Sequence, residues 1–108
     1  MGLSQAQKKA MRSIGHHLDP VVTVAENGLT ENVIAELERA LADHELIKIK
    51  IALSERETRQ QLIDTIVQQT QAEVVQTIGK MALFYRRNPN ANPKLSNVAR
   101  ANEHHGRH

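Results

Sequence analysis

The sequence has no cysteine, no tryptophan, one phenylalanine and one tyrosine among its 108 residues. Without cysteine the chain can form neither a disulfide scaffold nor a thiolate site, which fits a reducing compartment. Phe84 and Tyr85 are too few aromatic side chains for the base-stacking surface of RRM and OB folds. The composition therefore argues against disulfide-rich proteins and against aromatic binders of single strands.

Long apolar runs are also missing. No stretch approaches the roughly 20 apolar residues of a membrane-spanning helix, and the first residues contain no apolar core of a secretory signal. Hydrophobic residues make up 40% and charged residues 24% of the chain, which is typical of a folded domain. We expect one cytoplasmic domain without a membrane segment.

The motifs of several enzyme classes are absent. The sequence has no glycine-rich phosphate loop of the ATPase or dinucleotide-binding type and no serine in a nucleophile elbow. The segment His44 to Lys48 begins like a zinc-protease motif, but Lys48 takes the place of the second histidine. We expect a protein that is not an enzyme, with no catalytic residue, no metal site and no cofactor.

Three amphipathic helices are predicted from apolar residues at three-to-four spacing. The first begins at a capping box formed by Ser4 and Gln7, and Pro20 prevents it from continuing. Thr30 caps the second helix. The third helix begins at a second capping box, residues 54–57.

Four strands are predicted from β-branched or alternating segments. They are Val21–Val24, Ile47–Ile51, Val74–Ile78 and Ala82–Tyr85. The order αβαβαββ, with two crossover helices and a closing hairpin, predicts an α/β two-layer sandwich on a four-stranded mixed sheet. Residues 1–87 form this domain, whereas the turn-rich residues 88–108 are expected to be a flexible, basic C-terminal tail.

Charged side chains are unevenly distributed, although the formal net charge is only +2. Acidic side chains predominate in residues 26–73 and basic ones in residues 1–25 and 74–108. If folding joins the two basic ends, they form a positive surface that attracts polyanions. With few aromatic residues, recognition would depend on phosphates, sugar hydroxyls and shape. This favours structured RNA as the ligand, with DNA as the alternative.

Two further patterns place basic side chains within reach of a polyanion. Lys48 and Lys50 alternate with isoleucines and so project from one face of their strand. Lys80 lies at a glycine turn, where exposed backbone N–H groups and an ammonium can approach the same phosphate.

Four segments of the chain resemble the YhbY family of bacterial RNA-binding proteins, whose module is the CRM domain of plant organelle splicing factors. These segments are Gly15–Val22, Asn27–Glu31, His44–Ile51 and Gln76–Arg86. The resemblance implies a fold similar to the C-terminal domain of translation initiation factor three, with sheet order 1-2-4-3 and an antiparallel last strand. It also implies a protein, expected to be a monomer, that associates with ribosomal RNA in the precursor of the large ribosomal subunit and assists its maturation.

The resemblance also suggests a loop similar to the GxxG loop of KH domains. Here that loop consists of Gly79, Lys80, Met81 and Ala82, so its second glycine is missing. A Lys80–phosphate contact is therefore expected, but a KH-type backbone clamp is not. The complete set of predicted RNA contacts is Lys8, Arg12, Lys48, Lys50, Arg59, Gly79, Lys80, Arg86 and Arg87.

An alternative function uses the acidic face of the second predicted helix. Its acidic side chains are Glu31, Glu36, Glu38 and Asp43. They would dock a basic partner, such as a ribosomal protein, and make the domain a protein-interaction adaptor.

Overall fold

The computed structural model describes residues 3–99 of the chain. Its helices and strands are α1 (Gln5–Gly15), β1 (Pro20–Val24), α2 (Glu31–His44), β2 (Leu46–Ile51), α3 (Arg56–Thr70), β3 (Glu73–Ile78) and β4 (Met81–Tyr85). The predicted order αβαβαββ is confirmed. None of the helices in this part of the chain is long and apolar enough to cross a membrane.

The four strands form one mixed sheet in the order β1-β2-β4-β3. The pair β1 and β2 is parallel, because α2 carries the chain back between them. Strand β4 runs antiparallel to both of its neighbours, β2 and β3. The predicted sheet order and the antiparallel last strand are therefore confirmed.

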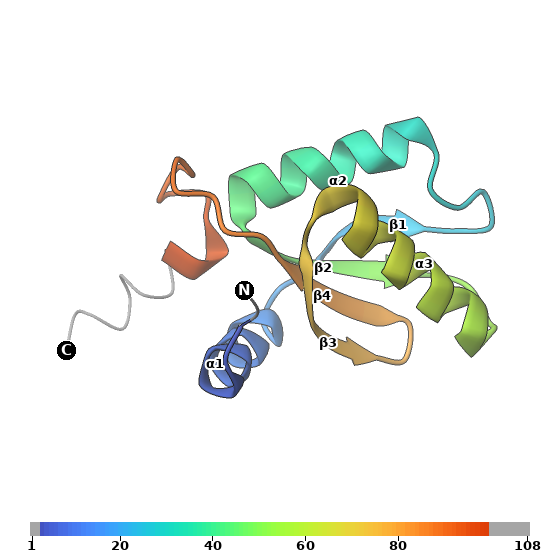
Figure 1. Ribbon diagram of the computed structural model, residues 1–108, viewed down its shortest axis with the longest axis horizontal. Helices are drawn as coiled ribbons and strands as arrows, with labels where there is room; N and C mark the ends of the chain where they lie inside the picture. Colours follow the sequence, from blue (N-terminus) through green and yellow to red (C-terminus); the bar gives the residue numbers. More distant parts are fainter. Residues whose placement is uncertain (1–2, 100–108) are drawn as a thin grey trace.

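The helices are divided between the two faces of the sheet (Figure 1). Helices α2 and α3 cover one face, where Ile47, Ile49 and Ile51 of β2 are buried in the main core. Helix α1 lies on the other face, where Met11 packs with Leu46 in a smaller core. Alternation along β2 separates the two cores, because successive side chains point to opposite faces. Lys48 and Lys50 therefore share the face of α1.

The first two helices begin as the sequence predicts. The Ser4 hydroxyl accepts a hydrogen bond from the Gln7 backbone N–H at 3.1 Å, and the Gln7 side chain accepts one from the Ser4 N–H at 2.8 Å. Thr30 caps α2 by accepting from the Val33 N–H at 3.2 Å. The capping box of α1 and the cap of α2 are confirmed.

The capping box predicted for α3 is wrong. The N-cap is Glu55, and its side chain makes no capping hydrogen bond. Instead, Nη1 of Arg59 donates to the carbonyl of Leu53 at 2.7 Å and to that of Ser54 at 2.9 Å. A guanidinium in the first turn of the helix thus fixes the loop, a contact that the capping pattern does not reveal.

The segment after β4 folds back onto the domain. The Glu45 carboxylate accepts from the Asn88 backbone N–H at 2.9 Å and from the Ser96 hydroxyl at 2.7 Å, and Ser96 is fully buried. The Asn97 amide donates to the carbonyl of Leu46 at 2.7 Å. Residues 88–97 were expected to belong to a flexible tail because they offer few apolar side chains to bury. The structure instead anchors them to the domain through these polar contacts. The rest of that tail from residue 100 lies outside the described residues.

Candidate nucleic-acid interface

Arg86 is placed as a structural residue and not on an open surface. Its Nη1 lies 2.6 Å and 2.9 Å from the two carboxylate oxygens of Glu38 and donates to the carbonyl of Thr70 at 2.9 Å. The Arg86 side chain is only 25% exposed. Its charge is compensated by Glu38 and its Nη1 is engaged, so the structure holds Arg86 as a link between α2, α3 and the end of β4.

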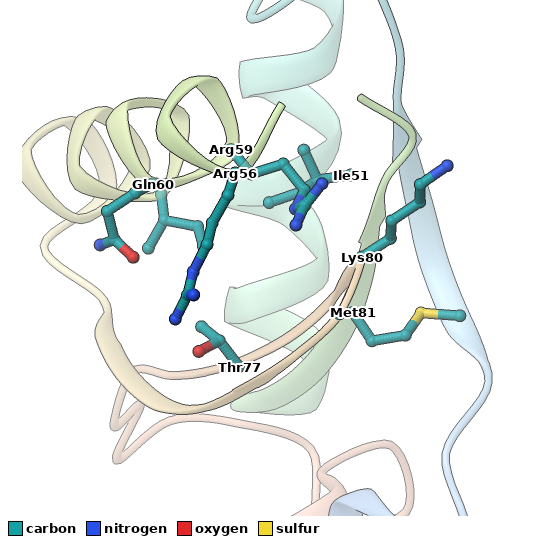
Figure 2. A pocket seen from close by; sticks show the side chains of 9 residues that line it. Ile51, Arg56, Arg59, Gln60, Thr77, Lys80 and Met81 are labelled. Carbon is teal, nitrogen blue, oxygen red and sulfur yellow. The ribbon is translucent and has the colours of Figure 1, made fainter. Parts of the chain in front are cut away.

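Three of the predicted contacts come together in a pocket of about 330 Å³ (Figure 2). It lies where the first turns of α3 meet the β3–β4 turn. We call it the cationic pocket; its lining comprises Ile51, Arg56, Arg59, Gln60, Ile63, Thr77, Gly79, Lys80 and Met81. Because the N-terminal end of a helix has a partial positive charge, α3 adds to the attraction of this pocket for anions.

The β3–β4 turn holds its position through backbone geometry. Gly79 has φ +55°, a left-handed conformation that favours glycine, although a Cβ there would meet no atom within 4 Å. The Lys80 carbonyl accepts from the Ile51 N–H at 2.7 Å, which ties the turn to the end of β2. The side chain of Lys80 is exposed, and in Figure 2 it extends away from the arginines. The turn thus presents a cation at the edge of the pocket.

Two arginines provide the remaining charge of the cationic pocket. The hydrogen bonds of Arg59 to the loop carbonyls use Nη1, so its guanidinium is fixed in place with other N–H groups left to donate. Arg56 is exposed and extends toward Thr77 in Figure 2. The sequence prediction did not include Arg56. Its i, i+3 spacing from Arg59, which places both on one side of α3, is the signal that identifies it.

Lys48 and Lys50 lie on the part of the sheet that α1 leaves uncovered. Across the sheet Lys48 pairs with Leu83 and Lys50 pairs with Met81 of β4. Lys50 is exposed and Lys48 is half-buried. The ion pairs found within residues 3–99 are Arg39–Asp43 and Arg86–Glu38, so neither lysine has a carboxylate partner there. We call this surface the open sheet face.

The other predicted contacts lie apart from the cationic pocket. Lys8 and Arg12 are one turn apart on α1, and both are half-buried. Arg87 is exposed just after β4, at the opposite end of this strand from Lys80. The structure thus gathers Arg59, Gly79 and Lys80, but it does not bring all predicted cations into one patch.

Neighbouring arginines compensate part of the negative charge on the acidic face of α2. Glu38 pairs with Arg86, and Asp43 lies 4.0 Å from the guanidinium of Arg39. Glu31 and Glu36 are the exposed acidic residues that remain of the four. The face therefore offers a basic protein less charge than the sequence suggests.

Fold and surface together define a class of protein: a small α/β domain with a cationic pocket at one end of a half-open sheet. The family model of the CRS1 / YhbY (CRM) domain matches residues 3–86, and the chain belongs to this family.

Two similar proteins have names that refer to RNA. The probable RNA-binding protein PA4753 of Pseudomonas aeruginosa is 62% identical over 100 residues, which cover 93% of this chain and 96% of that protein. An RNA-binding protein of Haemophilus influenzae is 50% identical over 93 residues, which cover 86% of this chain and 94% of that protein.

A solved structure has the same fold. The solution structure of the hypothetical protein SAV1595 from Staphylococcus aureus matches with a TM-score of 0.73 and 31% sequence identity. The match covers 84% of this chain and 95% of that one, so the similarity extends over the whole domain.

Proposed function

We propose that this protein binds RNA through phosphate contacts, without catalysing a reaction, and that its target is ribosomal RNA in the precursor of the large subunit. Membership of the CRM family and the names of the relatives support RNA as the ligand. The ribosomal precursor is the finer part of the proposal and follows from the family resemblance. It requires a cytoplasmic protein, which we expect to act as a monomer that assists subunit maturation.

The observation that carries the proposal is the cationic pocket. Arg59 is held rigidly by two loop carbonyls, Arg56 lies one turn away, and the Gly79–Lys80 turn closes the other side. A phosphate in this pocket would meet two guanidinium groups and the N-terminal end of α3, with the Lys80 ammonium at the edge of the pocket. Arginine donors of fixed geometry suit phosphate oxygens, so the pocket can position an RNA strand without reading its sequence.

Binding to fragments of large-subunit ribosomal RNA tests the pocket directly. Lys80→Glu should weaken binding about tenfold or more, since it replaces an attraction for phosphate with a repulsion. Lys94→Glu is the matched control, because Lys94 is exposed and lies outside the pocket. Equal affinities of the two variants in a filter-binding titration would place the site elsewhere.

Cell extracts test the ribosomal part of the proposal. The wild-type protein should sediment with precursors of the large subunit, and Lys80→Glu should shift it to the top of the gradient. Nuclease treatment should also release the protein. Retention on particles after RNA removal would contradict RNA binding and favour docking to a basic protein through α2.

A further inference from the structure

A second hollow, of about 250 Å³, lies on the open sheet face beside the C-terminal end of α1. Its lining is mainly apolar and comprises Gly15, His16, Lys48, Gln76, Ile78, Met81, Ala82 and Leu83. We call it the apolar hollow. Its volume falls just below the roughly 300–1,000 Å³ of sites for drug-sized ligands, which suits a small planar group.

The apolar hollow exists because α1 ends early. A Cβ on Gly15 would lie 2.4 Å from a methyl carbon of Leu83, so the end of α1 packs on β4 more closely than a side chain permits. The chain then turns at His16 and His17 toward β1, and the sheet beyond Leu83 stays uncovered. The glycine thus sets one wall of the hollow.

Two rows of side chains cross the sheet at this place. Lys50, Met81 and Ile78 form one row, and Lys48, Leu83 and Gln76 form the next, as the strand register shows. Residues paired across a sheet share a face, so each row has a lysine at the β2 side and an apolar centre. The surface therefore places the two lysines of β2 directly beside the apolar side chains of β4.

Ile78 is the most exposed large apolar side chain of the described residues, with 64% of its surface accessible. Because Ile78 also lines the apolar hollow, its exposed surface enlarges the apolar area that a partner can contact. The partner must also suit Lys48 and Lys50, which lie two residues apart along β2 and hence about 7 Å apart. An anionic polymer with a flat, mainly apolar group on each unit meets both requirements.

We propose that the apolar hollow binds one unpaired base of the RNA, while Lys48 and Lys50 bind phosphates beside it; this rests on the proposed function. Ile78, Met81 and Leu83 contact the face of the base, and the Gln76 amide offers a donor and an acceptor to its edge. Met81 lines both the apolar hollow and the cationic pocket, so one strand reaches both. A base inside a duplex is stacked on both faces and cannot enter.

Two RNA hairpins with the same stem test this proposal, one fully paired and one with a single bulged nucleotide. The wild-type protein should prefer the bulged hairpin about fivefold to tenfold, the low end of the range for stacking of a base on an aromatic side chain. Ile78→Ser should abolish this preference and leave the affinity for the paired hairpin unchanged. The exposure of Ile78 makes the change harmless to the fold, which circular dichroism checks.

Leu95→Ser is the matched control, because Leu95 is an apolar side chain 42% exposed that lies outside the hollow. It should keep the full preference. The base site would be overturned if the wild-type protein bound both hairpins with equal affinity, or if Ile78→Ser lost the same factor of affinity for both. Either result would leave the proposed function standing. Failure to bind either hairpin at low salt would instead overturn the proposed function.

A fluorescent adenine analogue, 2-aminopurine, at the bulged position gives a second readout. Its emission should change when the wild-type protein binds, because the base moves from water into the apolar hollow. The same emission change with Ile78→Ser would contradict the proposal.

Discussion

Tyr85 lies at the end of β4, where its ring packs against the smaller core under α1. Burial raises the pKa of its hydroxyl above the ordinary value, the nearby Glu45 carboxylate raises the pKa further, and Arg87 opposes the shift. All three effects change the free energy of the negatively charged tyrosinate relative to the neutral tyrosine. The pKa of Tyr85 therefore depends on the charges near Glu45, where the segment after β4 attaches to the domain.

The raised pKa of Tyr85 makes stability depend on alkaline pH. The folded protein holds this proton more tightly than the unfolded chain, so the contribution is complete below about pH 10 and is lost as the pH rises through the folded-state pKa. We expect the free energy of unfolding to fall more steeply above pH 10 in the wild type than in Tyr85→Phe. Urea denaturation from pH 8 to pH 11 measures the difference, and parallel curves would contradict it.

Arg86 links three elements, because its guanidinium on the chain after β4 bonds to Glu38 of α2 and to the last residue of α3, Thr70. Arg86→Met keeps much of the side-chain length but leaves the Glu38 carboxylate and the Thr70 carbonyl without this donor. We expect a loss of about 1–2 kcal/mol in the free energy of unfolding, since Glu38 remains partly exposed. Urea denaturation gives the value, and RNA affinity should change less than twofold.

Arg39→Met is the control for this pair. Arg39 is 87% exposed and lies 4.0 Å from Asp43, so its loss should cost less than about 0.5 kcal/mol. Equal, small losses in the two variants would show that Arg86 does not join the elements.

At the scale of elements, the sequence predicted what depends on local periodicity. The alternation from Ile47 to Ile51 determined which face β2 buries, and the capping residues Ser4 and Thr30 marked two helix starts. The wrong capping box of α3 reflects a local contact of Arg59 with Leu53 and Ser54, whereas other features were missed because they depend on polar contacts between distant residues. Arg86 meets Glu38 across 48 positions and Ser96 meets Glu45 across 51, and neither pairing leaves a periodic signal.

The candidate site was partly predictable for the same reason. The turn glycine and Lys80 are local signals, and so is the projection of Lys48 and Lys50 from one face. The apolar hollow is not local, because it needs the end of α1 against Leu83 of β4. Only the tertiary structure brings those residues together.

Across the whole molecule, exposed acidic and basic side chains gather at different places on the surface. The exposed acidic residues Glu31 and Glu36 lie on α2, whereas Lys48 and Lys50 lie on the opposite, open sheet face (Figure 1). The cationic pocket continues the positive surface at the edge. A polyanion is therefore attracted to the open sheet face and to the end of α3 that forms the cationic pocket, and the exposed carboxylates of α2 repel it, which orients the domain on RNA before close contact.

This arrangement predicts how binding depends on salt. Each lysine that neutralises a phosphate releases condensed counterions, which adds roughly 0.9 to the slope of log affinity against log salt for a duplex and roughly 0.7 for a single strand. The triple variant Lys48→Ala, Lys50→Ala, Lys80→Ala should therefore lower the slope by about 2 to 3 on structured ribosomal RNA. Filter binding between about 50 and 200 mM salt measures it.

The single variant Lys94→Ala should leave the slope unchanged, because this exposed lysine lies outside both the cationic pocket and the apolar hollow. A slope that falls equally in Lys94→Ala and in each single lysine variant would mean that RNA senses only the net charge of the protein. A slope that falls only for the lysines of the open sheet face and the β3–β4 turn assigns the released counterions to those residues. The salt dependence thus separates a defined docking surface from general attraction, which affinity at one salt concentration does not.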